Sequence, residues 1–390
     1  FGSGTDIGTD EFVVYKGTSS GVTVTGLTNG TTYYFTIFSR VGNEWSDGVE
    51  VWCIPQPVTS FNPGDLAIIA VNTNHTTIGE EFTFVSFVDI TEGTSIDFTE
   101  NGWEREYADT WGTTEGTIRL TRESNGTVTA GTSITVVMNG VNGTNGSHFD
   151  VFVDGTDELS LGYWSIAQLN PTDGQGFNLN EFDDIWIMQG GSWIENSTGS
   201  NPSFHDDEYT GYVLYGWTAT GWPGSDAPGS TAFSNLYPSC ECFNTNVSGM
   251  DYYSKVKYTG PMTDVSKLEW IMRFNDTTLW DGYIDDVSYD AATPQYRQSG
   301  ININIVPGTF EPGRWTSAED QDWFYCGNWQ NLIVPDETTD VLVSTTYASD
   351  VAVVDSSDNA LCHDLTIESG IGLDYSDGNH TNNTIEIHGD

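Results

Sequence analysis

The sequence has few basic residues and no long apolar stretch, and both shortages exclude classes of partner. It contains 11 Lys and Arg against 56 Asp and Glu, which gives a formal net charge of −45. A chain of this charge repels phosphate backbones, so we expect no nucleic-acid partner. No run of about 18 apolar residues is present, so we expect no membrane insertion.

Motifs that mark common catalytic and metal sites are also scarce. The six histidines lie among Asn, Ser and Asp residues and form no H-E-x-x-H pair. Gly17–Gly21 matches G-x-S-x-G, but it lies between two predicted strands and lacks the helix that a nucleophile elbow requires. The five cysteines form no C-x-x-C pair, and no acid-rich turn has the EF-hand pattern. We therefore predict that the chain is not an enzyme and has no catalytic residues.

Aromatic, β-branched and turn-forming residues are abundant instead. The 390 residues include 14 Trp, 18 Tyr, 19 Phe and 43 Gly, a composition that favours strands joined by tight turns. We expect an all-β protein of tandem β-sandwich modules, with less than about a tenth of its residues in helices. The best candidate for a short helix is 264–274, where Val265, Leu268, Ile271 and Met272 recur at helical spacing.

Residues 1–57 form the first predicted module. Its segment LTNGTTYYFTI, with Tyr33 after an Asn-Gly turn, resembles the C-terminal half of a fibronectin type III domain. The resemblance implies that the Tyr33 hydroxyl caps a corner of a sandwich, and that the remaining strands and a secretion signal lie upstream of Phe1. Alternating apolar residues predict strands over 12–17, 21–27 and 33–41.

The second predicted module is a large β-sandwich over residues 60–308. Its first half contains GDLAIIAVNTN (64–74) and FVSFVDITEGTSIDFTENGW (84–103), followed by EGT and TAGT turns. This order resembles a repeat module of large surface proteins that bacteria export by the type IX system. The resemblance weakens over 192–250. It implies an extracellular, adhesin-like protein on the cell surface.

Residues 310–390 form the third predicted module, which resembles another module of the same surface proteins. Its short, evenly spaced strands predict either a β-sandwich or a rung-like, solenoid-like structure. We expect this module to continue past Asp390. The positions that carry the resemblance are Trp315, Asp322, Trp323, Asn328, Trp329, Val334, Pro335, Thr339, Asp340, Val341, Cys362, Leu365 and Ile367.

The resemblance also implies a disulfide within the third module. Related modules carry cysteines at the positions of Cys326 and Cys362, so we expect these two to pair. A loop of about 36 residues closed in this way would stabilise the module by roughly 3–4 kcal/mol. Cys240 and Cys242 are two residues apart, and we expect them to bridge each other or one of them to pair with Cys53.

Acid-rich turns and tryptophans supply the candidate binding residues. Carboxylates suit a hard cation, so calcium is the one cofactor that we consider. Tryptophan faces can stack on sugar rings, although core packing is the simpler interpretation of each one. The candidate metal ligands are His205, Asp206, Asp207, Glu208, Asp154 and Asp157, and Asp183-Asp184 is a further acid-rich turn. The candidate glycan contacts are Trp193, Trp217 and Trp222.

These features together predict a non-enzymatic extracellular surface protein, either an adhesin or a structural subunit of a cell-surface filament or sheath. Its expected partners are further copies of itself or other cell-surface proteins. The first alternative is a glycan-binding accessory region of a larger secreted hydrolase, which requires exposed tryptophans in a row. The second alternative, an enzyme in the central module, requires a deep pocket with several acids of perturbed pKa.

Overall fold

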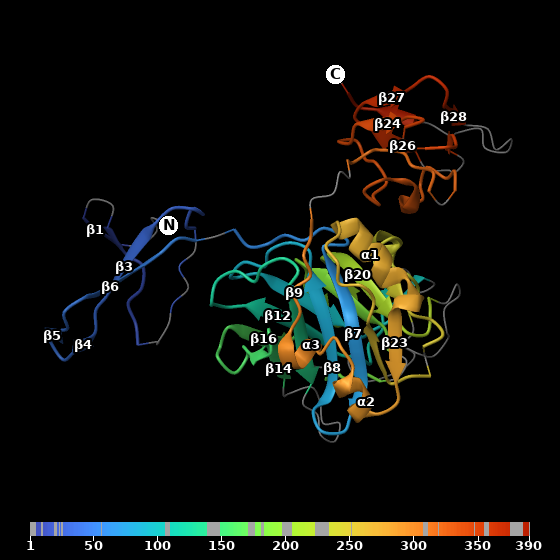
Figure 1. Ribbon diagram of the computed structural model, residues 1–390. Helices are drawn as coiled ribbons and strands as arrows, with labels where there is room; N and C mark the ends of the chain where they lie inside the picture. Colours follow the sequence, from blue (N-terminus) through green and yellow to red (C-terminus); the bar gives the residue numbers. More distant parts are fainter. Residues whose placement is uncertain are drawn as a thin grey trace. The chain divides into compact units, whose positions relative to one another are not determined.

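The computed structural model shows an all-β protein with 39% strand and 9% helix, folded into two compact units, Phe1–Thr59 and Ser60–Asp390 (Figure 1). The residues that the structure describes are 5–8 (backbone only), 11–18, 22, 24, 26–55, 57–105, 110–138, 149–170, 176–180, 183–196, 205–222, 234–250, 252–306, 311–318, 320–346, 348–354, 359–374 and 385–389.

The first unit consists of three antiparallel strand pairs. Its Tyr33 hydroxyl accepts a hydrogen bond from the Thr28 N–H (2.9 Å), which is the corner contact that the resemblance implies. None of its described side chains is fully buried, so the strand pairs lack a hydrophobic core of their own. The described positions of the predicted strand 21–27 are not in a strand. The pairs are β1 (Thr5–Gly8) with β2 (Glu11–Val13), β3 (Tyr33–Ile37) with β6 (Val49–Cys53), and β4 (Arg40–Val41) with β5 (Glu44–Trp45).

The second unit contains the predicted β-sandwich. One sheet has the strand order β16-β12-β9-β17-β20-β21 and the other has the order β15-β14-β13-β8-β7-β22-β23. All neighbours are antiparallel except β20 and β21. The strands are β7 (Leu66–His75), β8 (Gly79–Ser86), β9 (Ser95–Thr99), β12 (Thr117–Arg122), β13 (Ser133–Met138), β14 (Phe149–Val153), β15 (Thr156–Asp157), β16 (Trp164–Gln168), β17 (Ile185–Gln189), β20 (Tyr212–Thr218), β21 (Asn244–Asn246), β22 (Lys255–Tyr258) and β23 (Trp280–Tyr283).

Alternation along the strands determines which side chains enter the sandwich. Phe98 of β9 packs on Phe82 and Phe84 of β8, with ring centroids 4.9 and 5.2 Å apart, and so joins the two sheets. Along β17, Ile185 points into this core, whereas the next residue, Trp186, points to the opposite face. The hydrophobic period of two therefore builds one core between the sheets and leaves a second apolar surface on the outside of the six-stranded sheet.

Loops and short strands cover that outer surface with an aromatic layer. The layer includes Trp103, Trp111, Trp186 and Trp193, and Trp111 stacks nearly parallel to Tyr237 at 5.9 Å. Trp193 therefore packs in the interior, which confirms the simpler interpretation of this residue. The short strands here are β10 (Trp103–Glu104), β11 (Thr110–Trp111), β18 (Trp193–Ile194) and β19 (Glu208–Tyr209).

The short helix predicted over 264–274 is confirmed as α1 (Lys267–Asn275). The Ser266 hydroxyl caps its first turn by accepting from the Glu269 N–H. The other α-helices in the described residues are α2 (Asp286–Ala291) and α3 (Tyr296–Ser299). No described helix is long and apolar enough to cross a membrane. Single 3₁₀ turns occur at Pro238–Cys240, Thr277–Leu279 and Cys326–Asn328.

The C-terminal part of the second unit stacks its strands as parallel rungs. The register pairs Val341 with Leu365, Ala352 with Leu373 and Ala360 with Ile385, so each turn of the chain lies on the one before it. This arrangement is the solenoid-like alternative of the prediction and not the sandwich. The pairs are β24 (Val341–Val343) with β27 (Leu365–Ile367), β25 (Ala352–Val353) with β28 (Leu373–Asp374), and β26 (Ala360–Cys362) with β29 (Ile385–Ile387).

The predicted disulfides are wrong. The structure pairs Cys242 with Cys326, across 84 residues of sequence, and leaves Cys53, Cys240 and Cys362 as free thiols. Cys362 lies on a rung strand and packs in the small rung core, and Cys240 packs in the aromatic layer. Both interior thiols occupy positions of small apolar side chains.

The disulfide also changes the expected division into three modules. It joins residues of the predicted second and third modules, which belong to one compact unit in the structure. The rungs nevertheless have a separate hydrophobic cluster, in which Trp315, Trp323 and Trp329 pack on small side chains. The predicted module boundary near residue 310 therefore separates two hydrophobic cores that belong to a single compact unit.

Candidate functional site

The predicted ligands His205–Glu208 do not form one site in the structure, because their side chains contact different partners. Asp207 is buried, and its two oxygens accept from the Trp193 indole N–H (2.8 Å) and the Asn196 backbone N–H (3.1 Å). Glu208 is exposed and accepts from the side-chain amide of Asn196 (3.0 Å). His205 is buried with its Nδ1 3.6 Å from a carboxylate oxygen of Glu104. These residues hold the loop against the aromatic layer, and the described residues give them no shared ligand position.

Asp154 and Asp157 are turn residues in the structure. One oxygen of Asp157 accepts from the backbone N–H groups of Leu159 and Ser160, both at 3.2 Å. Asp154 adopts a positive φ of 49° at the tip of a hairpin. Local hydrogen bonding explains the Asp157 carboxylate, as it commonly does for Asp in turns. The Asp154 carboxylate accepts instead from the Asn302 side-chain amide (3.4 Å). Within the described parts of the chain, no third ligand converges with them.

The three candidate glycan platforms pack inside the protein. Trp217 is only 2% exposed and belongs to the core between the sheets. Trp193 is buried in the aromatic layer, where its indole donates to Asp207. Trp222 is half-buried. Its ring centroid lies 4.8 Å from that of Trp186, and its indole N–H donates to the side-chain oxygen of Asn244. Trp193, Trp217 and Trp222 therefore form no exposed row of rings.

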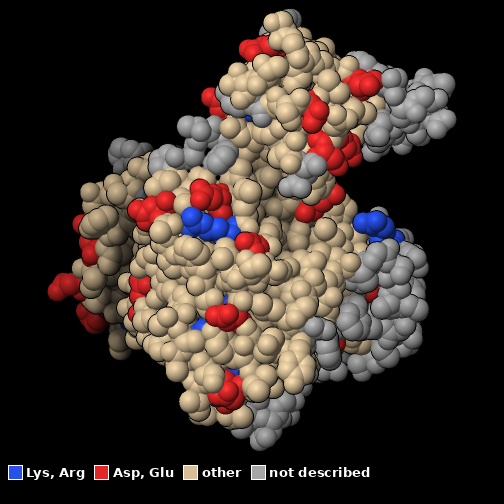
Figure 2. All heavy atoms as spheres, turned by 45° about the vertical axis from the view of Figure 1, so that its right-hand side comes forward, with Lys and Arg blue, Asp and Glu red and all other residues tan. Residues whose placement is uncertain are grey.

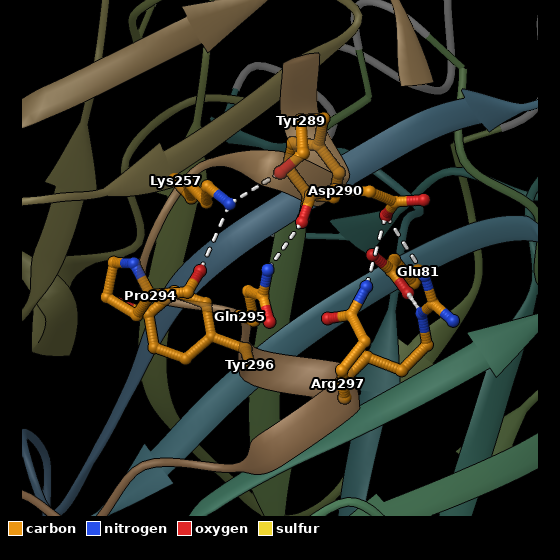
Figure 3. Close-up of a pocket in the computed structure, with 9 residues that line it drawn as sticks. Glu81, Lys257, Tyr289, Asp290, Pro294, Gln295, Tyr296 and Arg297 are labelled. Atoms are coloured by element: carbon orange, nitrogen blue, oxygen red, sulfur yellow. Dashed lines mark hydrogen bonds and ion pairs between the residues drawn. The ribbon is translucent and has the colours of Figure 1, made fainter. Parts of the chain in front are cut away.

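A small pocket near α2 and α3 is lined by charged side chains, but hydrogen bonds already engage them (Figure 3). Lys257 donates to the backbone oxygens of Tyr289 (2.7 Å), Ala292 (2.7 Å) and Pro294 (3.0 Å), so its ammonium closes a loop. Burial lowers the pKa of Lys257 to about 8. The cavity measures about 10 Å³, which is room for a single water molecule. A substrate has no space here.

An exposed group of possible metal ligands lies at one corner of the rungs. The ligand atoms of Asp340, His363 and Asp364 lie within 4.8 Å of one another. His363 Nδ1 is 2.8 Å from Asp340 and 3.9 Å from Asp364. Both aspartates are largely exposed, so hydration already satisfies their charge. No further observation points to a ligand at this corner.

The most unusual polar group in the described structure is a set of carboxylates at the ends of three central strands of the six-stranded sheet. β9 ends at Thr99, and Glu100 follows it directly. The register pairs Thr99 with Thr117, the first residue of β12, and with Trp186 of β17. Three adjacent strands therefore begin or end together, and the residues just outside them meet. We call Glu100, Glu115 and Asp183 the carboxylate cluster.

Backbone and side-chain hydrogen bonds join the members of this cluster. Glu100 Oε1 accepts from the backbone N–H groups of Gly116 (3.0 Å) and Asn178 (2.7 Å). The side chain of Asn178 in turn accepts from the Asn180 amide (3.3 Å), and the Asn180 N–H donates to Asp183 (2.6 Å). These bonds form a continuous path from Glu100 to Asp183.

Close backbone packing holds Glu115 beside this path. A Cβ atom at Gly116 would lie 2.3 Å from the Cα atom of Phe177, so only glycine permits this approach. The buried Asn101 side chain then binds both the N–H (3.0 Å) and the carbonyl (2.8 Å) of Glu115. Glu115 is thereby anchored by its backbone, while its carboxylate is half-buried.

Burial disfavours the charged form of all three carboxylates in the cluster. Burial raises the pKa of Glu100 well above its usual range, and the negative charges of Asp183 and Glu115 raise it further. Burial, followed by the charge of Asp183, raises the pKa of Glu115 to about 8. Burial raises the pKa of Asp183 to about 6. The next residue, Asp184, is also buried, and burial raises its pKa. Within the described residues, no lysine or arginine forms an ion pair with the cluster.

These raised pKa values predict that the free energy of unfolding decreases with rising pH. From about pH 4.5 to pH 8 the folded chain holds protons that the unfolded chain has released, so the free energy of unfolding falls across this window. We expect the thermal midpoint of the second unit to fall by on the order of 5 °C from pH 5 to pH 8. Glu115→Gln should flatten this dependence, whereas Glu337→Gln at an exposed position should not. An identical slope in Glu115→Gln and the wild type would contradict the prediction.

Sequence reasoning identified only part of this cluster. Asp183 belongs to an acid-rich turn that the sequence shows, whereas Glu100 and Glu115 each stand alone among Thr, Asn and Gly. Their position beside the ends of β9 and β12 is seen only in the structure. Comparison with known proteins adds no assignment, because no protein-family model, curated protein or solved structure matches the chain.

Proposed function

We propose that this chain is part of a non-enzymatic extracellular surface protein and serves there as a structural or adhesive segment. The observation that carries the proposal is the disulfide between Cys242 and Cys326. Disulfides persist mainly in oxidising compartments outside the cytosol, so the bond supports an extracellular location. It also links the sandwich covalently to the rungs, which suits a segment that must transmit force.

The distribution of charge supports an exposed, highly hydrated setting. On the face shown in Figure 2, acidic side chains are scattered and basic side chains are few. The net charge of −45 keeps separate copies apart in low salt. Salt screens this repulsion over about 10 Å at 0.1 M ionic strength. Assembly with other copies should therefore depend on ionic strength.

The first unit supports a role that includes contact with other protein. Its paired strands expose large apolar side chains: Tyr34 is 67% exposed, and Trp52, its cross-strand partner, is 66% exposed. Trp45 on the neighbouring strand pair is also exposed. Clustered apolar exposure of this kind is typical of surfaces that are covered in the working state. A freely diffusing enzyme has no need of it.

The state of the buried polar residues supports a non-catalytic role. The Lys257 ammonium donates hydrogen bonds to three backbone oxygens. Asp97 forms an ion pair with Arg119 (2.7 Å) and accepts from the Tyr209 hydroxyl (2.7 Å). Lys257 and Asp97 are thus held by structural partners, unlike a poised acid or base.

Fractionation, light scattering and turnover assays test the proposal together. We expect the disulfide-bonded protein in the extracellular fraction, particle size that grows with salt, and no turnover of glycosides, esters or peptides. Replacing Tyr34 and Trp52 with Lys should prevent the growth in particle size, because it removes the exposed apolar pair. Tyr252→Lys, at an equally exposed position in the second unit, is the matched control. Detectable turnover, or a monomer at every salt concentration, would overturn the corresponding part of the proposal.

A further inference from the structure

The stack of rungs has an open end within the part of the chain that the structure describes. Its last layer has a paired neighbour on one side only: β27 pairs with β24, β28 with β25 and β29 with β26 (Figure 1). The other side of β24 is covered, because Leu342 forms a parallel bridge to Arg314. Val353 of β25 is bridged to Asp322 in the same way.

Burial changes sharply from one layer of the stack to the next. Val343 of β24 is 0% exposed, whereas Ile367, its partner in register on β27, is 43% exposed. Cys362 of β26 is also 0% exposed, and its partner Ile387 on β29 is 57% exposed. Partners in register lie on the same side of the sheet, so both isoleucines continue the interior of the stack. They are exposed because no described layer follows them.

The backbone of β27 presents hydrogen-bonding groups at this open end. On one flank of β27, the Asp364 carbonyl accepts from the Val341 N–H of β24 (2.7 Å). On the other flank, the Glu368 N–H donates to the Val343 carbonyl of β24 (3.0 Å). Alternate residues of a strand direct these groups to opposite sides, so the N–H and C=O groups of Ile367 point away from β24. An outward row of this kind is a template for a further strand.

The same alternation gives the edge two chemically different faces. Leu365 and Ile367 face the interior of the stack, whereas Thr366 and the flanking Asp364 and Glu368 face solvent and are exposed. A strand that adds here places its own side chains beside these, and cross-strand pairs of opposite charge are stabilising. The edge therefore favours a segment with apolar residues at one set of alternate positions and basic residues at the other.

We propose that the outer edge of β27 binds an extended, basic segment of another protein, which adds as a further parallel strand. Its apolar side chains cover Leu365 and Ile367, and its lysine or arginine side chains lie beside Asp364 and Glu368. Main-chain hydrogen bonds supply affinity and the alternating side chains supply specificity, as in other cases of strand addition. This interaction goes beyond the proposed structural role, because it defines the chemistry of a partner.

A second copy of this chain fits the edge less well than a basic partner. Residues 315–390 contain no lysine or arginine, so the rungs of another copy repel this edge. The strands that contain two basic residues, β12 and β22, are paired on both sides within their own sheets. They offer no free edge for addition to β27.

Fluorescence anisotropy of a labelled peptide of alternating valine and lysine, titrated with the full chain, tests the proposal. We expect saturable binding of one peptide per chain, weakened by salt because the charge pairs are exposed. A valine–glutamate peptide should not bind. In the parallel register the lysine amides face β27, so their N-methylation should weaken binding by about tenfold or more. N-methylation of the valine amides, which face away from β27, should change the affinity by less than about threefold.

Variants of the chain locate the binding edge. Ile367→Lys should abolish binding of the valine–lysine peptide, because it places a positive charge where an apolar side chain must pack. Ile284→Lys is the matched control, since Ile284 is 68% exposed elsewhere in the second unit, and it should bind like the wild type. Asp364→Asn and Glu368→Gln should each weaken binding by about threefold. Unchanged thermal midpoints verify that these variants fold.

Three outcomes would overturn the proposal. Equal binding of the valine–glutamate peptide would refute the charge preference, and full affinity in Ile367→Lys would refute the location. Self-association of the full chain that Ile367→Lys abolishes would assign the edge to a second copy instead of a basic partner. None of these outcomes affects the location and turnover measurements that test the proposed function.

Discussion

Replacing Cys326 with Ser is expected to lower the free energy of unfolding of the rungs by about 4–5 kcal/mol, the value for closing a loop of this length in the chain-entropy description. The bond spans 84 residues and connects the sandwich to a part whose own core is small. The rungs gain much of their stability from this covalent attachment, because ten buried residues supply limited apolar burial. Hydrogen exchange at Val341–Val343 should therefore accelerate strongly in the variant.

Cys53→Ser is the matched control for this prediction. Cys53 is a free, exposed thiol in the first unit, so its loss should leave exchange in the rungs unchanged. Reduction of the wild type with dithiothreitol should reproduce the Cys326→Ser result. Unchanged protection of β24 in Cys326→Ser would contradict the prediction, and peptide mapping of a Cys326–Cys362 bond would contradict the pairing itself.

Glu158→Ala is expected to destabilise the sandwich by roughly 3–5 kcal/mol, because it leaves a buried guanidinium without its counter-ion. The Arg122 side chain is 2% exposed and forms an ion pair with Glu158. Arg122 also donates to the carbonyls of Asn125 and Gly126, both at 3.1 Å, and Trp164 donates to the same carboxylate (2.9 Å). Chemical denaturation of the full chain, followed by tryptophan fluorescence, measures the loss.

The exposed pair of Arg314 and Glu311 offers the matched comparison. Glu311→Ala should cost less than about 1 kcal/mol, since water and salt screen that pair. The double variant Arg122→Met/Glu158→Met should recover much of the loss caused by Glu158→Ala, because it removes both buried charges. Equal costs for Glu158→Ala and Glu311→Ala would show that water reaches the Arg122 pair in solution.

Much of the local structure was predictable from the sequence. The period-two alternation predicted the all-β fold, and helical spacing predicted α1, because both patterns depend only on the chain's own geometry. The corner contact of Tyr33 was also expected from a local segment. For the third module, spacing alone left sandwich and rungs as equal alternatives, since parallel and antiparallel pairing produce similar alternation in short strands.

The candidate binding residues were predicted much less well. The acidic loop around Asp207 was predicted to supply metal ligands, yet Asp207 packs inside the outer layer of the sandwich. For Trp193 and Trp217 the simpler interpretation, core packing, is confirmed. Composition cannot distinguish a tryptophan on a surface from one beneath a loop, because the covering loop lies elsewhere in the sequence. Glu100 and Glu115 were missed for the same reason, since their neighbours come from 176–184.

The sequence by itself determined the strands, the short helix, the acidic surface and the absence of apolar segments long enough to span a membrane. Each of these depends on composition or on residues within a few positions of one another. Only the tertiary structure decided that Cys242 pairs with Cys326, and that Glu100, Glu115 and Asp183 lie near one another at the ends of three central strands. Both outcomes depend on which strands become neighbours, and that choice is made by packing between segments about 15 to 85 residues apart.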